Sequence, residues 1–438
     1  MTSVPSTDLH CARTSKATLI EDRKRYFPSS LVLSHARIDP LQAVSGKGDK
    51  IYDENGNEYL DTRNNVPILG HADLRVVDAV ARQMSLITTN TRYLHPSLSE
   101  LAAELSSILP PKLCKFFFVN SGSEANDLAL RLARYHTGST RVIAQTQAYH
   151  GITLAAMAVS ECKFRAPFVV KEEWVDIVNV PDLLNGEHDS LSPYIAEVEA
   201  VCNRHSGDVS AMILESVVSV GGGIFQPPGY MSSVFSLVRE TGGVCICDET
   251  QVGLGRLGTW WGFEFDGSEE AVPDILTIGK QLGNGFPVAA VVTTEEIAAS
   301  LEETKIEVFS TFGGSTVSCA AAVATIRALR EDRLMENARD TGMYLIAAFR
   351  EQLAPFMPEI VRDIRGHGLY IAVQLANGDI AKHMNDALYK DWKILSTLDG
   401  PDDNVMIVKP PLCFSLASCD RFVLAIVQIL KSLERNPV

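Results

Sequence analysis

Short apolar runs alternate with stretches of helical periodicity through the middle of the chain. The runs occupy residues 116–119, 142–144, 211–214, 244–247, 275–278 and 288–292. Each has the length of a buried strand, and most of the segments between them are long enough for a helix. The alternation predicts βαβ units, and therefore an α/β fold with a mostly parallel sheet from about residue 115 to about residue 300.

The two ends of the chain show other patterns. Residues 1–30 are polar and rich in Ser and Thr without clear periodicity, which predicts an arm that is loose or packs on a partner. Asn55-Gly56 lies between two short runs with apolar residues and predicts a β-hairpin. Apolar residues at helical spacing predict helices after Asp73 and over 320–329, and strands are predicted at 369–373 and 405–408.

Composition and charge narrow the class of protein. With 438 residues, 46% hydrophobic and 21% charged, the chain has the composition of a globular protein of two or more domains. Its net charge of −15 creates a field that repels nucleic acid and anionic membrane surfaces. No apolar run approaches the roughly 20 residues of a membrane-spanning helix. We therefore expect neither nucleic acid nor a membrane as a partner.

The nine cysteines indicate a reducing compartment. Their count is odd, no CxxC motif occurs and no His/Cys cluster has metal-ligand spacing, so we expect reduced thiols, a cytoplasmic location and no metal site. Cys245 and Cys247 fall on one face of a predicted strand and are interpreted as core residues. Basic residues among Ser and Thr near the N-terminus leave a mitochondrial transit peptide as the alternative, which Asp8, Glu21 and Asp22 oppose.

Three polar residues end or follow three of the apolar runs: Glu215, Asp248 and Lys280. They are 33 and 32 positions apart, one βα period each. Three strand ends would thus deliver two carboxylates and an amine to the carboxyl edge of the sheet, where ligands bind in open α/β folds. One such residue alone is more often a solvated loop residue, but three at the strand period favour a site.

An anion-binding turn is predicted upstream. Ser121-Gly122-Ser123 separates an apolar run from a helical pattern, so the backbone at Gly122 can approach a ligand and the helix dipole at Ser123 attracts an anion. The alternative is an ordinary Ser N-cap. Near the end of another predicted strand, Tyr149 and His150 precede a glycine. An aromatic ring at this edge can stack on a planar ligand; the alternative is that it only packs against other side chains of the protein.

Together these groups are what pyridoxal phosphate requires. The amine forms a Schiff base with its aldehyde, the turn binds its phosphate and the aromatic covers its ring. A carboxylate retains the proton on the ring nitrogen, which makes the ring an electron sink. Few other cofactors need this set.

The chain resembles the class-III aminotransferases, pyridoxal-phosphate enzymes of fold type I, from about Ile51 to Leu433. The matching stretches are Asn120-Ser-Gly-Ser-Glu-Ala-Asn126, Tyr149-His-Gly151, Asp248-Glu-Thr-Gln251, residues 273–280 with Gly283-Asn-Gly285, Thr311-Phe-Gly-Gly314 and Arg365-Gly-His-Gly-Leu369. The resemblance implies a large domain with a mostly parallel sheet of the seven-stranded type and a smaller α+β domain built from both chain ends. We assign 1–30 to the arm, 31–70 and 320–438 to the small domain, and 71–319 to the large domain.

The resemblance also implies roles for single residues. Lys280 is similar to the lysine that carries the cofactor and moves the substrate proton, Asp248 to the partner of the ring nitrogen, and Gln251 to the residue near the cofactor hydroxyl. Tyr149 is similar to the stacked aromatic, with His150 beside it as a further cofactor-binding residue.

The phosphate site implied by the resemblance involves two subunits. Gly122 and Ser123 are joined there by Thr311 of the neighbouring subunit, so the family pattern implies a homodimer with shared active sites. Glu215 matches an active-site glutamate of the family.

The expected activity is the transfer of an amino group from a small amine or ω-amino compound to a keto acid or aldehyde. The best local similarity is to the branch of phosphoethanolamine and phosphohydroxylysine phospho-lyases and alanine-glyoxylate aminotransferase-like proteins, so elimination of phosphate and ammonia from an O-phosphorylated amino alcohol is the alternative. A protein that binds the cofactor without catalysis is a third hypothesis. Ile407 stands where aminotransferases that bind an α-carboxylate have Arg, and Arg92 is the candidate anion ligand, with a surface salt bridge as its alternative.

Overall fold

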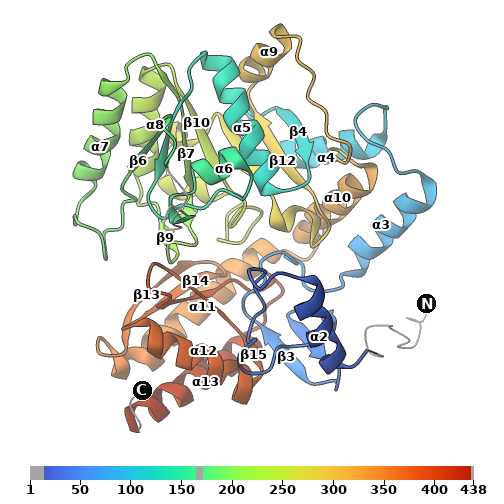
Figure 1. Cartoon of the computed structure of the whole chain (residues 1–438), viewed down its shortest axis with the longest axis vertical. Coiled ribbons are helices and arrows are strands. Elements are labelled where there is room, and N and C mark those ends of the chain that lie inside the picture. The colour runs from blue at the N-terminus through green and yellow to red at the C-terminus, as the bar shows by residue number, and fades with distance from the viewer. Residues whose placement is uncertain (1–13, 164–170, 436–438) are drawn as a thin grey trace.

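A seven-stranded sheet forms the centre of the larger part of the molecule (Figure 1). The computed structural model describes residues 14–163 and 171–435. The order in the sheet is β4 (Lys115–Val119), β12 (Ala289–Thr293), β11 (Ile275–Ile278), β10 (Val244–Asp248), β7 (Val209–Glu215), β5 (Arg141–Gln145) and β6 (Val175–Val178). Among these strands, β12 alone runs opposite to the other six, so the predicted mostly parallel sheet is confirmed.

Helices pack on both faces of this sheet, α5 (Gly122–Thr137) on one and α7 (Leu191–Arg204) and α8 (Tyr230–Glu240) on the other. The other helices of this part are α3 (Leu74–Leu86), α4 (Pro96–Ser106), α6 (Leu154–Ala158), α9 (Glu295–Glu303) and α10 (Thr316–Glu331). A short hairpin, β8 (Val217–Val218) with β9 (Ile224–Phe225), follows β7. The 3-10 turns are η1 (Glu161–Lys163), η2 (Gly262–Asp266), η3 (Glu269–Ala271) and η4 (Lys280–Gly283).

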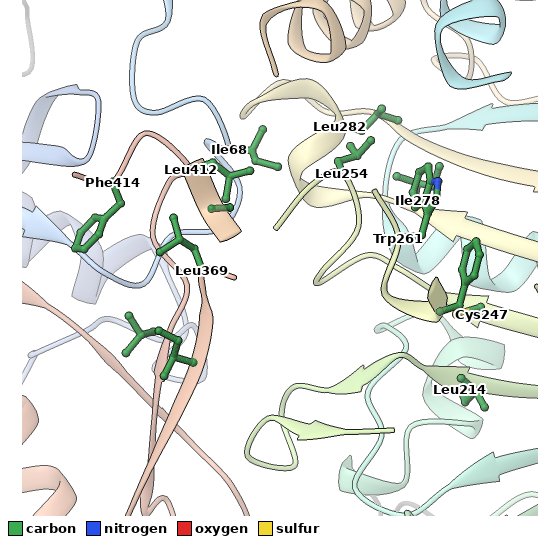
Figure 2. Close-up of a cluster of buried hydrophobic side chains, with 14 of the residues drawn as sticks. Ile68, Leu214, Cys247, Leu254, Trp261, Ile278, Leu282, Leu369, Leu412 and Phe414 are labelled. Atoms are coloured by element: carbon green, nitrogen blue, oxygen red, sulfur yellow. The ribbon is translucent and has the colours of Figure 1, made fainter. Parts of the chain in front are cut away.

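The alternation of side chains along the strands separates two cores. Cys245 and Cys247 of β10 face the larger core, which includes α7, α8 and α10, while Val244 and Ile246 face the core under α5. Both cysteines are fully buried, which confirms their interpretation as core residues. Figure 2 shows the larger core reaching from Leu214, Cys247 and Ile278 past Leu254 and Ile68 to Leu369, Leu412 and Phe414 of the smaller part.

The smaller part combines both ends of the chain. Its first sheet contains β1 (Ala43–Lys47), β2 (Lys50–Asp53), β3 (Glu58–Asp61) and β15 (Ile394–Leu395), and its second contains β13 (Val361–His367), β14 (Tyr370–Leu375), β17 (Val405–Val408) and β16 (Thr397–Asp399). The remaining elements are α2 (Lys16–Tyr26), α11 (Leu334–Leu353), η5 (Ala354–Phe356), α12 (Gly378–Trp392) and α13 (Leu416–Arg435). Because β15 pairs with β3, segments more than 300 residues apart share one sheet.

Local predictions can be compared with these elements. The hairpin at Asn55-Gly56 is confirmed by the antiparallel pairing of β2 with β3. The helix predicted over 320–329 begins earlier, at Thr316, and so crosses the boundary drawn between 319 and 320 to pack on α3 and α4. In the predicted N-terminal arm, residues 1–13 lie outside the described residues, whereas 16–26 form α2, a helix capped by Ser15 with no buried residue.

No helix within the described residues is long and apolar enough to cross a membrane. In the same part of the chain, no three His, Cys, Asp or Glu side chains form a group that could hold a metal ion.

Candidate functional site

The three strand ends predicted to form a site are neighbours in the sheet. Strands β11, β10 and β7 are adjacent, and Asp248 at the end of β10 lies in register with Glu215 at the end of β7. Lys280 begins the turn η4 that follows β11. The predicted convergence of these residues at one sheet edge is therefore confirmed.

A cavity of about 230 Å³ lies at this edge. Seven of the residues singled out in the sequence line it: Gly122, Ser123, Tyr149, His150, Asp248, Gln251 and Lys280. Asn126, Gly151 and Thr250 complete the lining. Glu215 lies behind the wall, whereas Thr311 and Arg92 do not line the cavity of their own chain.

The first turn of α5 forms one wall. Its N-cap is Ser121, whose hydroxyl accepts a bond from the Glu124 amide, so Gly122 and Ser123 lie in the first helical turn with amides that no helical carbonyl can bind. A Cβ at Gly122 would come within 3.0 Å of Thr250, and one at Gly151, whose φ is +137°, would collide with Ser123. These glycines leave a narrow cradle in which backbone amides can reach an anion.

Asp248 is buried and remains a carboxylate. Burial raises its pKa, but a hydrogen bond from His150 Nδ1 to Asp248 Oδ2 at 2.9 Å and the amide of Thr250 at 3.0 Å more than offset this, so its pKa is lowered from the usual value. An ionised carboxylate at the bottom of a cavity can bind a protonated ring nitrogen.

Glu215 is buried behind Tyr149. Its Oε1 accepts a hydrogen bond from the Tyr149 amide at 3.1 Å, which holds the backbone of that segment at the cavity. Burial, with the nearby charge of Asp248, raises the pKa of Glu215 to about 7. Its protonation state therefore changes near neutral pH.

Lys280 combines a strained backbone with a less basic amine. Its φ of +36° lies in the left-handed region, which is uncommon for a residue with a side chain and recurs at functional sites. Burial lowers the pKa of its amine, although the charges of Asp248, Glu215 and Asp399 raise it. A larger fraction of neutral amine is therefore present than in an ordinary lysine.

Gln251 and Tyr149, which also line the cavity, are constrained by a hydrogen bond and by burial respectively. Gln251 Oε1 accepts a hydrogen bond from Asn65 Nδ2 at 2.8 Å, which links the cavity to the smaller part of the chain. Tyr149 is half-buried, and burial raises the pKa of its hydroxyl, so it remains neutral.

Thr311 and Arg92 lie outside the cavity on one exposed surface. The Thr311 carbonyl accepts a hydrogen bond from Asn90 Nδ2 at 3.0 Å, and the Arg92 guanidinium lies 3.9 Å from the ring centre of Phe309. Arg92 forms no ion pair within the described residues, so the salt-bridge alternative has no partner there.

A second cationic residue near the site was missed in the sequence. Ile407 is fully buried in an apolar cluster with Tyr370 and Val405, so it leaves no place for an anion clamp. Two positions later, Lys409, whose side chain is 12% exposed, lies 3.7 Å from Asp399. Burial lowers the pKa of its amine to about 8; the charge of Asp399 opposes this, and the charges of Lys280, Arg256 and Arg63 add to it. In the sequence, the feature that pointed to Lys409 is its position directly after the apolar run 405–408.

The cavity fits pyridoxal phosphate. Gly122 and Ser123 supply free amides for a phosphate, Asp248 supplies a buried charge for the ring nitrogen, and Lys280 supplies an amine for the aldehyde. The glycine cradle leaves room where a Cβ would collide.

Comparisons with known proteins agree with this geometry. The aminotransferase class-III family matches residues 34–430. The chain is 40% identical to an "alanine--glyoxylate aminotransferase 2-like" protein of Drosophila melanogaster, over 96% of this chain and 88% of that one, and 34% identical to "ethanolamine-phosphate phospho-lyase homolog 1" of Caenorhabditis elegans, over 96% and 95%. Among solved structures, a phospholyase from Arthrobacter in complex with phosphoethanolamine is 32% identical, with a TM-score of 0.86 and coverage of 95% and 100%.

Proposed function

Because the chain belongs to the class-III aminotransferases, a family of pyridoxal-phosphate enzymes, we propose that it transfers the amino group of a small amine or ω-amino compound to a keto acid or aldehyde. The observation that carries this proposal is one cavity lined by Lys280, Asp248 and the first turn of α5. They supply the amine for the cofactor aldehyde, the negative charge for its ring nitrogen and the anion site for its phosphate.

When bound, pyridoxal phosphate supplies an aldehyde that captures the substrate amine and a ring that accepts the electron pair released at the substrate carbon. Lys280 would take the proton from that carbon and return it, because burial increases the neutral fraction of its amine. Asp248 would accept a hydrogen bond from the protonated ring nitrogen of the cofactor, since its carboxylate stays ionised.

The other residues would bind and orient. Gly122 and Ser123 would hold the phosphate, and the ring of Tyr149, with its backbone fixed by Glu215, would cover the cofactor and exclude water. Gln251, held by Asn65, would meet the cofactor hydroxyl, and His150 would act through Asp248.

The test is turnover of a panel of amines with keto acids and aldehydes. We expect keto product in proportion to amine consumed, a visible absorption band of the bound cofactor that borohydride removes, and loss of both in Lys280→Ala. Conversion that is equal in wild type and Lys280→Ala and no faster than with free pyridoxal phosphate would contradict the proposal and favour a protein that only binds the cofactor.

A phospho-lyase reaction is the second candidate, and the surroundings of Lys409 favour it. Ile407 stands in place of the usual carboxylate clamp, while Lys409 and Arg63 bring two basic side chains close to Asp399, on which the charge of Asp403 also acts. A basic side chain such as Lys409 near Lys280 can bind a phosphate dianion. The Arthrobacter phospholyase and the nematode homologue carry this activity in their names.

One incubation separates the two candidates. With phosphoethanolamine alone, stoichiometric phosphate and ammonia would contradict amino transfer, whereas accumulation of pyridoxamine phosphate from an amine alone would contradict elimination.

We predict that Lys409→Met raises KM for phosphoethanolamine about tenfold, because a charge-assisted contact to phosphate is lost. Phosphate release gives the measurement. Lys382→Met, at an exposed position on α12, is the matched control and leaves KM unchanged. An unchanged KM in Lys409→Met would remove this support for the lyase.

We also propose a homodimer with shared active sites. Large apolar side chains are exposed beside Arg92 and Thr311 in the chain, among them Tyr93, Leu94 and Phe312 at 68%. A face of this kind is typical of a protein interface. Thr311 lies outside its own cavity, which supports a role in the site of a second copy.

For the compartment we propose the cytoplasm. The eight cysteines among the described residues are free thiols, as expected in a reducing environment. Relatives from Arabidopsis thaliana and Homo sapiens are named as mitochondrial, so imaging of the full-length protein fused at its C-terminus decides between the two.

A further inference from the structure

The side of Asp248 that is turned into the protein is held by Asn126. Asn126 Nδ2 donates to Asp248 Oδ2 at 2.7 Å and also to the His150 carbonyl at 2.7 Å. Asn126 is 1% exposed and Asp248 is 4% exposed, so water does not compete for these bonds. Asn126, on the buried face of α5, thus donates hydrogen bonds to two residues that line the cavity.

Thr277 fixes the direction of this amide. Its hydroxyl donates to Asn126 Oδ1 at 2.7 Å, so turning the amide would place an oxygen against the Asp248 carboxylate and leave Thr277 without its acceptor. Thr277 lies on β11 in register with Asp248 on β10. Helix α5 and two adjacent strands therefore hold one carboxylate.

We propose that Asn126, oriented by Thr277, is a positioning residue that stabilises the ionised form of Asp248 and thereby keeps the ring nitrogen of the cofactor protonated. Oδ2 accepts from both Asn126 and His150, whereas Oδ1 accepts the Thr250 amide. The inference rests on the cofactor and applies equally to amino transfer and to elimination.

The physical reason lies in the balance between burial and hydrogen bonding. A carboxylate and a ring nitrogen share one proton, and each bond to the carboxylate favours the state in which the ring nitrogen holds that proton. Without the Asn126 amide, the proton shifts toward Asp248 and the ring loses its positive charge.

The first experiment compares two ligands of the full-length apo-protein. We expect Asn126→Ala to weaken binding of pyridoxal phosphate about tenfold and to leave binding of 1-deazapyridoxal phosphate, which has C–H in place of the ring nitrogen, nearly unchanged. Equal losses for both ligands would mean that Asn126 only shapes the cavity and would overturn the proposal.

A second variant keeps the proposal testable if Asn126→Ala does not fold. Thr277→Val removes the hydroxyl that orients the amide, and Thr325→Val is its matched control, because both threonines are fully buried and Thr325 bonds only within α10. With ¹⁵N-labelled cofactor, we expect the ring-nitrogen resonance to move toward the unprotonated position in Thr277→Val and to stay in place in Thr325→Val. An unmoved resonance in Thr277→Val would overturn the proposal, whatever the amine turnover of that variant.

Discussion

At the scale of residues, burial acts on three charged groups of the site with different results. It lowers the pKa of Lys280 and raises that of Glu215 to about 7, because each loses water that stabilised its charge. Asp248 is just as buried, yet its pKa is lowered because donors surround its carboxylate. Hydrogen bonding thus decides which carboxylate stays charged at neutral pH.

This balance predicts how Lys280 captures the cofactor. The rate of capture by apo-protein should rise with pH and level off below the pH expected for an ordinary lysine. Glu215→Gln removes a negative charge that favours the ammonium form of Lys280, so the profile should move to lower pH. The growth of the visible absorption band measures the rate.

Glu295→Gln is the control for this profile, because Glu295 is exposed and pairs with Lys115 far from the site. A profile that stays in place in Glu215→Gln would show that the charge of Glu215 does not act on Lys280.

At the scale of elements, the two ends of α5 use glycine for different purposes. At its C-terminal end, Gly138 has φ +69° and serves as the C-cap, with open space around it. Next to its N-terminal end, Gly151 has φ +137° and packs directly against Ser123. The first glycine only ends the helix, whereas the second brings a loop close to the expected phosphate site.

The contrast gives a paired prediction. Gly151→Ala should push the loop away from the first turn of α5 and weaken cofactor binding by tenfold or more, because a Cβ there collides with Ser123. Gly138→Ala should cost about 1 kcal/mol of unfolding free energy from left-handed strain alone.

Urea unfolding of the apo-proteins and titration with pyridoxal phosphate separate these effects. Normal cofactor affinity in Gly151→Ala would contradict the steric explanation, as would an equal loss of affinity in Gly138→Ala.

At the scale of the whole molecule, buried polar groups join the two parts of the chain. Arg256 is fully buried and donates to the carbonyls of Leu369, Pro410 and Asn65, which lie in three separate segments. Burial without a carboxylate at hydrogen-bond distance lowers its pKa to about 9. The cavity is thereby attached to the segment that carries Lys409.

The proposed shared site predicts complementation between two inactive proteins. Lys280→Ala lacks the amine, and Thr311→Glu would repel the cofactor phosphate of the partner's site. If Thr311 acts across the interface, mixed dimers contain one site with both residues intact, and random mixing should restore about a quarter of wild-type activity.

Activity after co-refolding of the two variants measures this recovery, and sedimentation reports the dimer. No recovery in mixtures that contain mixed dimers would place Thr311 in the site of its own chain.

Much of the fold can be read from the chain because its central strands are continuous apolar runs. Strands β7, β10 and β11 are buried on both faces, so the runs that predict them are apolar up to the sheet edge except for Thr277 in β11. Strand β13 was not predicted, because its sequence Val-Arg-Asp-Ile-Arg-Gly-His is polar and half exposed. Strand β15 has only two residues, and its pairing with β3 depends on the tertiary structure.

By itself the sequence determined the strand-end residues Glu215, Asp248 and Lys280 and the turn at Gly122, because local periodicity and strand spacing suffice to bring them to one sheet edge. Only the tertiary structure decided which side chains support them. The contact of Asn126 with Asp248 spans 122 positions and that of Lys409 with Asp399 depends on a hairpin. The charge of each group then follows from burial and donors in three dimensions, which no local pattern contains.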